Sequence, residues 1–389
     1  MRILHVDHAQ VLGGAERSIL ELARAQMELG HEPIVAVGRA GAFTEALDVK
    51  QIRFHVLGWS SRFVGTAQTA DAPELLLRMP DFAHAAAALR HYVKRVRPDV
   101  VQAHTRKAQL AATLALWDVK VPLIWHVRDD LPTRTPLRAL LALAMKRADH
   151  AVALSYWLSR SYVSRHALPK SGRIGIVPSG VDAAPLSRLP TPWLDGGRPP
   201  IVGFVGQIAR WKAPHLLIDA AERCRHDSAS FRIIGGVTFP AAEHEYGCWL
   251  RDRLSWSPAR DRIQWLAPTR EPAEAFAQLD VFVHTSVAPE PFGRVLVEAM
   301  VARRPIIALR KGSAIELLDD ETAVFADSED GEAIASAIAS VIDDRSAAQE
   351  RVERAALKAA NYDPLFVAAR MDGEYAQLAG TSRTKNRSG

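Results

Sequence analysis

The chain has 389 residues, of which 48% are hydrophobic and 24% charged, a composition typical of a globular protein with two or three domains. Its net charge of +5 comes without any helix-turn-helix, zinc-finger or RNA-binding signature, which disfavours nucleic acid as a partner. The first ten residues lack the apolar core of a signal peptide, and no apolar run reaches the roughly 18 residues of a membrane span. Cys224 and Cys248 make neither a disulfide framework nor a metal-binding spacing, so we expect a chain that works in the reducing cytoplasm.

Short β-branched strands alternate with amphipathic helices along the whole first half. The first strand spans residues 2–7, a glycine loop follows, and a helix with apolar residues at helical spacing ends at Gly30. The segment 58–78 is irregular and is expected to be a loop. Further strands are predicted at 32–38, 99–104, 121–127, 149–155 and 173–180, with helices near 80–96, 106–117, 136–147 and 156–166.

Residues 182–200 interrupt this pattern with five prolines and two glycines, which is typical of a linker. A second alternation follows, with strands at 200–206, 230–236, 261–266, 280–285, 304–309 and 321–326 and helices near 329–342 and 345–359. Such alternation predicts α/β domains with parallel sheets, here two doubly wound domains with the ligand site in the cleft between them. We place the domains at residues 1–184 and 200–361, the linker at 185–199, a helix that packs back toward the first domain at 362–379, and a disordered tail at 380–389.

The first loop, VLGGAE, lies between the first strand and the first helix. Gly13 and Gly14 let the backbone approach a ligand closely, and the free N–H groups at the start of the helix suit an anion such as phosphate. The loop lacks the G-x-G-x-x-G fingerprint of dinucleotide-binding domains, and no acidic partner for a ribose follows at the expected spacing. A glycine turn without a ligand is the alternative.

A second loop of this kind, GQIARWKAP, opens the second half. Gly206 ends a strand, and Arg210 and Lys212 precede a helix that starts near Pro214. Cations at a helix N-terminus oppose the helix dipole, an arrangement that makes sense where an anion lies between them. Two exposed cations on a loop are the alternative.

The stretch HTSVAPEPFGRVLVEAMVARRPIIAL, residues 284–309, carries Glu290 and Glu298 eight residues apart around an apolar run. Pro291 suits a first helical position, and the N–H groups of residues 293–295 are then unpaired. They can hold a pyrophosphate while the two carboxylates accept hydrogen bonds from hydroxyl groups on either side. Alternatively, Glu290 is an acid favoured by the helix start and Glu298 faces solvent, although the apolar neighbours of Glu298 disfavour this.

The segment PEPFGRVLVEAM resembles the E-x7-E signature of the retaining family 4 glycosyltransferases, which have the GT-B fold of two Rossmann-like domains with an interdomain cleft. Four other segments resemble motifs of that family in order and spacing: GGAER, IVPSGVD, VGQIARWK and KGSAIELL. The resemblance runs from residue 3 to about residue 365. It implies a nucleoside-diphosphate sugar as the donor and no cofactor or obligate metal.

The resemblance also implies roles for the matching residues. Glu290 holds hydroxyls of the donor sugar near the reacting carbon, Glu298 binds the nucleotide ribose, and Lys212 neutralises the diphosphate. His126, at the end of the strand LIWHV, approaches the donor sugar, although without the resemblance it is better interpreted as a satisfied core histidine. The implied catalytic set is Glu290, His126, Lys212 and Arg210. The implied donor-binding set is Gly13, Gly14, Gly206, Gln207, Gly235, Phe292, Gly293, Arg294, Val295 and Glu298, with loops 235–244 and 266–271 lining the base and sugar pockets.

Some positions depart from the family pattern. Gln207 stands where the family usually has Arg, and Arg210 is a candidate for supplying the missing cation. Ala213 replaces the glycine after the phosphate-binding lysine, and Ser179 replaces the asparagine of the family's NGVD segment. We interpret these as local variation in an active enzyme.

The implied reaction keeps the configuration of the anomeric carbon. Cations and helix N–H groups stabilise the departing diphosphate, and the carbon left behind resembles an oxocarbenium ion. The family's mechanism is same-face attack assisted by a leaving-group oxygen. Asp129 and Asp130 form an adjacent acidic pair, but such pairs are more often solvated than metal-bound, and no metal site is expected.

The acceptor is expected to contact the first domain, where residues 1–185 carry 24 Lys and Arg against 16 Asp and Glu. The basic, apolar helices 85–97 and 133–147 either rest on an anionic membrane, near a glycan or lipid-linked acceptor, or pack on their own sheet. The expected function is sugar transfer in cell-surface polysaccharide, lipopolysaccharide or glycolipid biosynthesis, in the cytoplasm and at the inner face of the membrane. Two alternatives stay open: a same-fold enzyme acting on a small metabolite, and a non-catalytic nucleotide-sugar-binding subunit.

Overall fold

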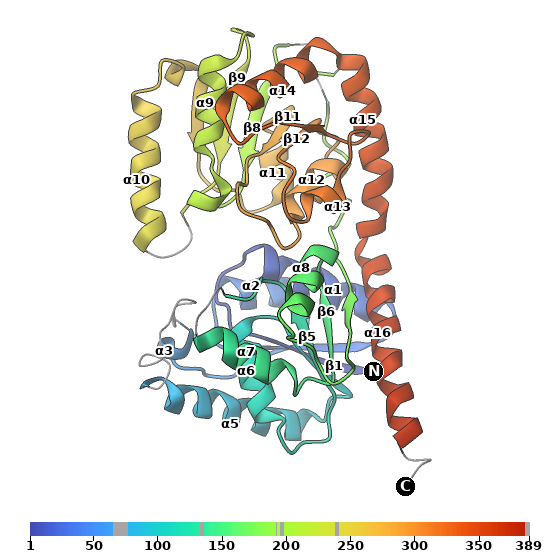
Figure 1. Cartoon of the computed structure of the whole chain (residues 1–389). Helices are drawn as coiled ribbons and strands as arrows, with labels where there is room; N and C mark the ends of the chain where they lie inside the picture. The colour runs from blue at the N-terminus through green and yellow to red at the C-terminus, as the bar shows by residue number, and fades with distance from the viewer. Residues whose placement is uncertain (65–76, 133–135, 192, 195–197, 238–240, 386–389) are drawn as a thin grey trace. The chain divides into compact units, whose positions relative to one another are not determined.

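The computed structural model describes the chain except for residues 65–76, 133–135, 192, 195–197, 238–240 and 386–389 (Figure 1). The chain forms two compact units. Unit 1 contains Met1–Gly180 together with Pro364–Gly389, and unit 2 contains Val181–Asp363. Unit 1 is therefore built from two separate stretches of the chain.

Unit 1 is a seven-stranded parallel sheet with the strand order β3-β2-β1-β4-β5-β6-β7. Its strands are β1 (Arg2–Asp7), β2 (Glu32–Val37), β3 (Phe54–Val56), β4 (Val100–Ala103), β5 (Leu123–Val127), β6 (His150–Ala153) and β7 (Ile174–Ile176). Its helices are α1 (Gly14–Glu28), α2 (Ala42–Val49), α3 (Ser61–Val64), α5 (Met79–Val96), α6 (Arg106–Ala115), α7 (Pro136–Met145), α8 (Tyr156–Ser164) and α16 (Pro364–Lys385).

Helices cover both faces of this sheet. On one face, Ile3, Ile124 and their neighbours pack against Leu22 of α1 and Met371 of α16. Trp125, the residue next to Ile124, points to the opposite face, where its indole N–H donates to Thr113 of α6. The alternation of side chains along each strand thus buries both faces, as parallel sheets require.

Unit 2 is a six-stranded parallel sheet with the order β10-β9-β8-β11-β12-β13. Its strands are β8 (Ile201–Val205), β9 (Ser230–Ile234), β10 (Ile263–Leu266), β11 (Val281–His284), β12 (Ile306–Ala308) and β13 (Val324–Phe325). Its helices are α9 (His215–Arg223), α10 (Ala241–Ser255), α11 (Pro272–Phe276), α12 (Arg294–Val301), α13 (Ala314–Leu317), α14 (Gly331–Asp343) and α15 (Arg345–Ala359), with short 3-10 turns at Arg210–Lys212, Arg260–Arg262 and Ala360–Tyr362.

The two sheets have the doubly wound order expected from the sequence, and the predicted strands are all present. Three elements of unit 1 were not predicted: β3, α2 and α3. They have three, eight and four residues, and β3 is only half-buried at the sheet edge, so none carries a long hydrophobic pattern. Most of the irregular segment predicted at 58–78 lies outside the described residues.

Much of the segment interpreted as a linker, residues 185–199, belongs to unit 2. Trp193 is fully buried in the core of that unit, and Arg198 forms two hydrogen bonds to the carboxylate of Asp280 at 2.7 and 3.0 Å. A high proline content marks a segment without helix or strand, but it does not prevent a large aromatic side chain from packing. Part of this segment lies outside the described residues.

The last helix, α16, packs on α1 and extends to Lys385, six residues into the stretch predicted to be a disordered tail. Its buried side chains Val367, Met371 and Tyr375 follow helical spacing and join the core of unit 1. Polar residues are tolerated in its final turns because no proline interrupts the helix there. Among the described residues, no helix is both long and apolar enough to cross a bilayer.

Candidate functional site

The acidic loop of unit 2 connects the end of β11 to the start of α12. Gly293 caps this helix in the left-handed region, with φ 77° and ψ 53°, where a side chain would be strained. Because the helix starts at Arg294, its first N–H groups lie outside the helix's own hydrogen-bond ladder. The fold therefore leaves donors beside Glu290.

Glu290 is the centre of a buried polar cluster. Its Oε1 lies 2.6 Å from the ammonium of Lys212, 2.9 Å from Nε2 of His284 and 2.6 Å from the hydroxyl of Ser286. Burial by itself would raise the pKa of Glu290, but Lys212 and His284 together hold it well below its ordinary value. Glu290 is therefore ionised, and the described contacts of its carboxylate all fall on one oxygen.

Two hydrogen bonds join the backbone at Lys212 and its preceding residue to the acidic loop. The backbone carbonyl of Lys212 accepts a hydrogen bond from the Thr285 hydroxyl at 2.6 Å, and the carbonyl of Trp211 accepts from the N–H of Val287 at 2.9 Å. The phosphate-loop candidate and the acidic loop are thus joined by backbone as well as by the ion pair. The structure brings Lys212 and Glu290 together as one site.

The glycines at the ends of β8 and β9 permit a close backbone approach. A Cβ on Gly235 would lie 1.8 Å from the carbonyl oxygen of Gly206, so only glycine fits there. Gln207 follows and is half-buried. The residue after Lys212, Ala213, is fully buried in the left-handed region at φ 47° and ψ 48°. Alanine thus occupies a conformation that glycine favours.

Arg210 does not join the Lys212–Glu290 pair. Its guanidinium lies over the ring of Tyr246, 5.3 Å from the ring centre, and its backbone N–H donates to Glu243 of α10. No contact among the described residues joins Arg210 to Glu290. Its predicted part in catalysis stays a prediction.

Glu298 is buried at 7% exposure on α12, one turn after Arg294. The Nε of Arg294 donates to Glu298 Oε1 at 2.8 Å, and both side chains are about nine-tenths buried. Val295 lies between them in the chain, and Phe292 is buried at the start of the helix. The two predicted glutamates therefore have different partners, Lys212 for one and Arg294 for the other.

Sequence reasoning missed His284 and Ser286, which share the Glu290 oxygen. Both stand in the stretch that was singled out, at the end of β11 and directly after it. Polar residues where a buried parallel strand ends are the signal that would have found them. Gly312 lies in the segment KGSAIELL; a Cβ there would lie 2.6 Å from the backbone nitrogen of Glu290, so this loop packs directly against the acidic loop.

A separate groove of about 830 Å³ lies in unit 2. It is bounded by the ends of β9 and β10 and by α10. It brings together parts of the two loops that were predicted to line the base and sugar pockets, although residues 238–240 lie outside the described residues. Its lining includes Gly235, Gly236, Val237, Arg251, Trp265 and Pro268.

In unit 1, the glycine loop is held by a buried carboxyl group. Glu16, in the first turn of α1, accepts a hydrogen bond from the N–H of Gly13 at 2.9 Å, and Gly14 is the first residue of the helix. Burial, and next the charge of Asp7, raise the pKa of Glu16 to about 7. The positive charge of Arg128 partly offsets this increase in the pKa of Glu16. Neither Glu16 nor Arg128 was singled out for this loop from the sequence.

His126 lies in β5 and is 1% exposed. Its Nδ1 is 2.8 Å from the side-chain nitrogen of Gln102, its Nε2 is buried, and the ring also interacts with the backbone of Val177. Burial lowers the pKa of His126 well below its usual value, and Arg128 lowers it further. The ring is therefore neutral, and its predicted contact with a donor sugar stays a prediction.

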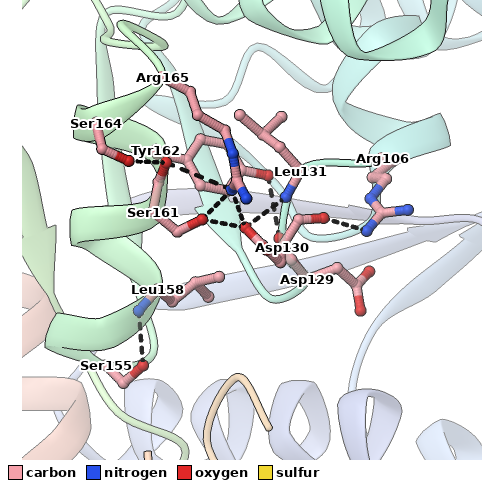
Figure 2. Close-up of polar contacts among 10 residues, drawn as sticks. All are labelled: Arg106, Asp129, Asp130, Leu131, Ser155, Leu158, Ser161, Tyr162, Ser164 and Arg165. Carbon is pink, nitrogen blue, oxygen red and sulfur yellow. Dashed lines mark hydrogen bonds and ion pairs between the residues drawn. The ribbon is translucent and has the colours of Figure 1, made fainter. Parts of the chain in front are cut away.

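The side chains of the acidic pair after β5, Asp129 and Asp130, do not point toward a common position. Figure 2 shows the Asp130 carboxylate between Arg165, at 2.6 Å, and the Ser161 hydroxyl, while the Asp129 side chain points away from it. The Tyr162 hydroxyl and the Arg106 guanidinium fix the backbone of this loop. Within the described part of the chain, no three His, Cys, Asp or Glu side chains are grouped to hold a metal ion.

Two family models match consecutive parts of the chain. The model for Glycosyltransferase Family 4 matches residues 12–184, and the model for Glycosyl transferases group 1 matches residues 192–359. The putative glycosyltransferase YtcC of Bacillus subtilis is 34% identical over 126 residues, 31% of this chain and 30% of that protein. A D-inositol 3-phosphate glycosyltransferase of Mycolicibacterium smegmatis is 30% identical over 269 residues, 65% of this chain and 56% of that protein.

The chain spans about a third of the length of the first curated relatives that it matches. Among solved structures, Anabaena HepE in complex with UDP and glucose has a TM-score of 0.81 at 23% identity, over 97% of this chain and 100% of that one. The sucrose-phosphate synthase of Thermosynechococcus elongatus has a TM-score of 0.78 at 17% identity, over 98% and 99%. These similarities confirm the fold class that the sequence predicted.

Proposed function

Because the chain belongs to the family 4 glycosyltransferases, whose models match both of its halves, we propose that it is a retaining glycosyltransferase using a nucleoside-diphosphate sugar. The observation that carries this proposal is the convergence of Lys212, His284 and Ser286 on one oxygen of Glu290. This arrangement leaves the second carboxylate oxygen for a sugar hydroxyl and places a cation beside it. Such a pair suits a donor that is polyhydroxylated at one end and anionic next to it.

The chemistry follows from these charges. The ammonium of Lys212 and the N–H groups at the start of α12 stabilise negative charge on the departing diphosphate. Glu290 orients the sugar and stabilises positive charge that develops on its anomeric carbon. Glu298 binds the ribose, and no metal is required. A uridine nucleotide is the first candidate donor, because HepE was solved with UDP and with UDP-glucose.

The test of the site is a transfer assay with a matched control. Glu290→Gln keeps the size of the side chain but removes its charge, and we expect it to lower kcat by about 100-fold or more, as loss of a group that stabilises transition-state charge does. Glu350→Gln, an exposed change on α15, should leave kcat unchanged. Full activity in Glu290→Gln would show that the site is wrong.

The donor is identified by a thermal-shift screen with UDP-, GDP- and dTDP-sugars. A true donor at 100 times its Kd stabilises the fold by about 2.7 kcal/mol through mass action. Hydrolysis of that donor without acceptor, lost in Glu290→Gln, separates an enzyme from a non-catalytic binding subunit. Binding with neither hydrolysis nor transfer to any acceptor would support the subunit.

The acceptor is proposed to be a glycan or lipid-linked sugar in cell-surface polysaccharide, lipopolysaccharide or glycolipid biosynthesis. A small anionic metabolite is the second candidate, since the relatives include a D-inositol 3-phosphate glycosyltransferase and an alpha-maltose-1-phosphate synthase. The basic charge of the first half of the chain suits either kind of acceptor. Transfer assays with lipid-linked acceptors in vesicles and with soluble sugar phosphates distinguish the two.

For a lipid-linked acceptor, we propose a membrane contact through α6 and α7. Leu143 on α7 is 65% exposed and Trp117 after α6 is 60% exposed, with Arg147 stacked on the indole at 3.7 Å. Exposed apolar groups beside cations suit an anionic membrane surface. The other candidate helix, α5, buries its apolar residues Phe82, Leu89 and Val93 in unit 1, which favours packing on its own sheet.

Vesicle flotation tests this surface. The protein should float with anionic vesicles at low salt, and Leu143→Glu should abolish flotation. Leu357→Glu, which changes an equally exposed leucine on α15 of unit 2, should not. Equal flotation of the two variants, or none by the unaltered protein at low salt, would contradict the proposal.

A further inference from the structure

A cavity lies in unit 1 at the edge of the sheet opposite to the glycine loop. Its volume is about 380 Å³, within the usual range of small-molecule pockets. Its lining includes Leu123, the first residue of β5, and Asp149, which directly precedes β6, so it lies at the amino ends of these strands. The glycine loop follows the carboxyl end of β1, and the strands of this sheet are parallel. The cavity is therefore separate from the loops at the carboxyl ends.

Helix α6 gives the scale of this separation. It begins at Arg106, after the carboxyl end of β4, and runs for 10 residues to Ala115, close before Trp117 of the cavity. At a rise of 1.5 Å per residue, the helix spans about 15 Å. One small ligand does not reach from the cavity to the carboxyl edge, so a molecule bound here is distinct from the proposed donor and acceptor.

The inner lining of the cavity is largely apolar. Its buried members include Leu116 after α6 and Leu123 at the start of β5, which are 8% and 3% exposed. The connection between them and the last helix contribute further apolar side chains. The apolar lining residues, beside Trp117, are Leu116, Val119, Val121, Pro122, Leu123 and Leu378. Such a lining favours a ligand with an apolar part.

Three cations belong to the lining of the same cavity. Lys120, Arg147 and Lys170 are exposed, which places their charged groups at its mouth. Asp149 is the acidic residue of the lining. Its Oδ1 accepts from the Lys170 ammonium at 2.8 Å and its Oδ2 from the backbone N–H of Leu123 at 2.9 Å. Both carboxylate oxygens are thus occupied, and Asp149 does not neutralise the other two cations.

Arg147 is oriented by an aromatic ring. Its guanidinium stacks on the Trp117 indole, 3.7 Å from the ring centre. A stacked guanidinium keeps its N–H groups available in the plane of the group, where they match the oxygens of a phosphate. Among the described residues, neither Arg147 nor Lys120 has a carboxylate partner. Two cations beside an apolar lining suit an amphiphilic anion.

The mouth of the cavity continues into the exposed apolar surface of α6 and α7. These two helices pack on each other and lie side by side in unit 1 (Figure 1). Trp117 belongs both to the cavity lining and to this surface, and Arg147 follows Leu143 by four residues. The apolar side chains of the surface are 40% to 65% exposed and comprise Leu114, Trp117, Leu140 and Leu143. An amphiphile whose head lies in the cavity can therefore place its chains on this surface.

We propose that this cavity binds the headgroup of an anionic phospholipid. The phosphate lies between Arg147 and Lys120, the glycerol and first chain carbons contact the apolar lining, and the acyl chains extend over the exposed surface of α6 and α7. The inference deepens the proposed membrane contact and rests on it for the source of the ligand. A lipid held in this way determines which side of unit 1 faces the bilayer, whereas attraction between diffuse charges does not.

Isothermal titration calorimetry of the full-length protein with a short-chain lipid below its micellar concentration tests the site without a membrane. Dihexanoylphosphatidylglycerol should bind in a saturable manner at a single site. Lys120→Glu should weaken this binding about 10-fold or more, because it replaces attraction to the phosphate by repulsion. The matched control is Lys50→Glu, an exposed change after α2 that should bind the lipid normally. Both variants lower the net charge from +5 to +3, so diffuse attraction changes equally in the two.

Two further ligands separate the parts of this chemistry. Glycerol 3-phosphate has the anionic head without chains, and dihexanoylphosphatidylcholine has the chains without net charge. Each should bind about 10-fold more weakly or less, since burial of even two CH2 groups contributes about tenfold. Equal binding of glycerol 3-phosphate would make the site one for free phosphate esters, and equal binding of the choline lipid would leave the cations without a part. Either result, no binding of the glycerol lipid, or equal binding by the two variants overturns the proposal.

The indole N–H resonance of Trp117 reports where the lipid binds. In proton–nitrogen correlation spectra it is assigned with Trp117→Phe, and dihexanoylphosphatidylglycerol should shift it. The indole resonance of Trp256, which is 84% exposed in unit 2, is the internal control and should stay in place. A shift of Trp256 with Trp117 unmoved would put the lipid elsewhere and overturn the assignment.

The test is independent of sugar transfer. Lys120→Glu should hydrolyse the donor at the rate of the unaltered protein, because the cavity lies about 15 Å from the carboxyl edge of the sheet. A loss of this hydrolysis would contradict a separate site. Lipid binding is measured without turnover, so failure of the proposed function leaves the lipid test intact. Failure of lipid binding likewise leaves the Glu290→Gln assay intact.

Discussion

At the scale of single residues, the acidic loop shows how a buried charge is stabilised by its partners. Glu290 and Lys212 are 8% and 12% exposed, so each depends on the other for its charge. Breaking a buried pair from one side costs about 3–5 kcal/mol, mostly because the remaining charge is left without a partner. Lys212→Met should therefore destabilise the protein more than the double variant Lys212→Met/Glu290→Gln.

Denaturant unfolding at pH 7 measures this double-mutant cycle. The folded pKa of Glu290 is depressed, so its contribution to stability is present above its unfolded pKa and is lost as pH falls through the folded value. The cycle should accordingly give the same coupling at pH 6 and pH 8. If the double variant lost as much free energy of unfolding as the two single variants lose together, this result would contradict a direct pair.

Ala213 gives a second prediction at this scale. A left-handed conformation costs an L-residue roughly 1–2 kcal/mol, and Ala213 adopts it at φ 47°. We expect Ala213→Gly to leave the free energy of unfolding equal or higher, since relief of strain offsets the lost methyl contact. Ala220→Gly, in the middle of α9, should lower the free energy of unfolding by about 1 kcal/mol or more. Equal losses in the two variants, measured by urea unfolding, would refute the strain.

At the scale of elements, the sequence predicted most strands but not all that surrounds the site. The predicted strands each have a short apolar run, and the candidate loops were placed by the rule that ligands bind at the carboxyl ends of parallel strands. The contact between Lys212 and Glu290 was not predicted. The partners His284 and Ser286 were missed, because their position at the end of a buried parallel strand was not used as a signal. The orientation of the Arg210 side chain could not be predicted from the sequence pattern either, because it depends on a contact with Tyr246, 36 residues later in the chain.

Helix α16 provides the prediction at this scale. Met371 is fully buried between α16 and the unit 1 sheet, beside Ile124 and Tyr375. Met371→Ala should lower the free energy of unfolding of unit 1 by about 2–5 kcal/mol, because it removes packing and leaves a cavity. Phe366→Ala, on the same helix but 48% exposed, is the control and should cost far less. Similar small losses in both, by denaturant unfolding, would show that α16 is not part of the unit 1 core.

At the scale of the whole molecule, the buried histidines give unit 1 a distinct response to acid. Burial lowers the pKa of His5 to about 4 and holds the pKa values of His104 and His126 well below their usual range. Below about pH 6.5 the unfolded chain therefore binds more protons at these three positions than the folded chain does. The free energy of unfolding thus decreases as the pH is lowered. Glu16 has the opposite effect. Because its pKa is raised, the folded chain binds more protons at Glu16 than the unfolded chain does between about pH 4.5 and pH 7.

The histidines outnumber this opposing group, so the free energy of unfolding of unit 1 is expected to fall as the pH is lowered from 6 to 5. Urea unfolding across this range measures the slope. His104→Gln should reduce it by about one proton, or roughly 1.4 kcal/mol per pH unit. A slope that is the same in His104→Gln as in the unaltered protein would contradict the assignment.

The return of the chain into unit 1 through α16 also governs how this protein can be recombined with its relatives. Unit 1 is assembled from residues 1–180 and from the helix that follows residue 363. In a chimera that takes only residues 1–180 from a relative, the α16 side chains Val367, Met371 and Tyr375 would have to pack against a sheet face with different residues. Unit 1 should therefore be exchanged as two segments together, with unit 2 inserted between them.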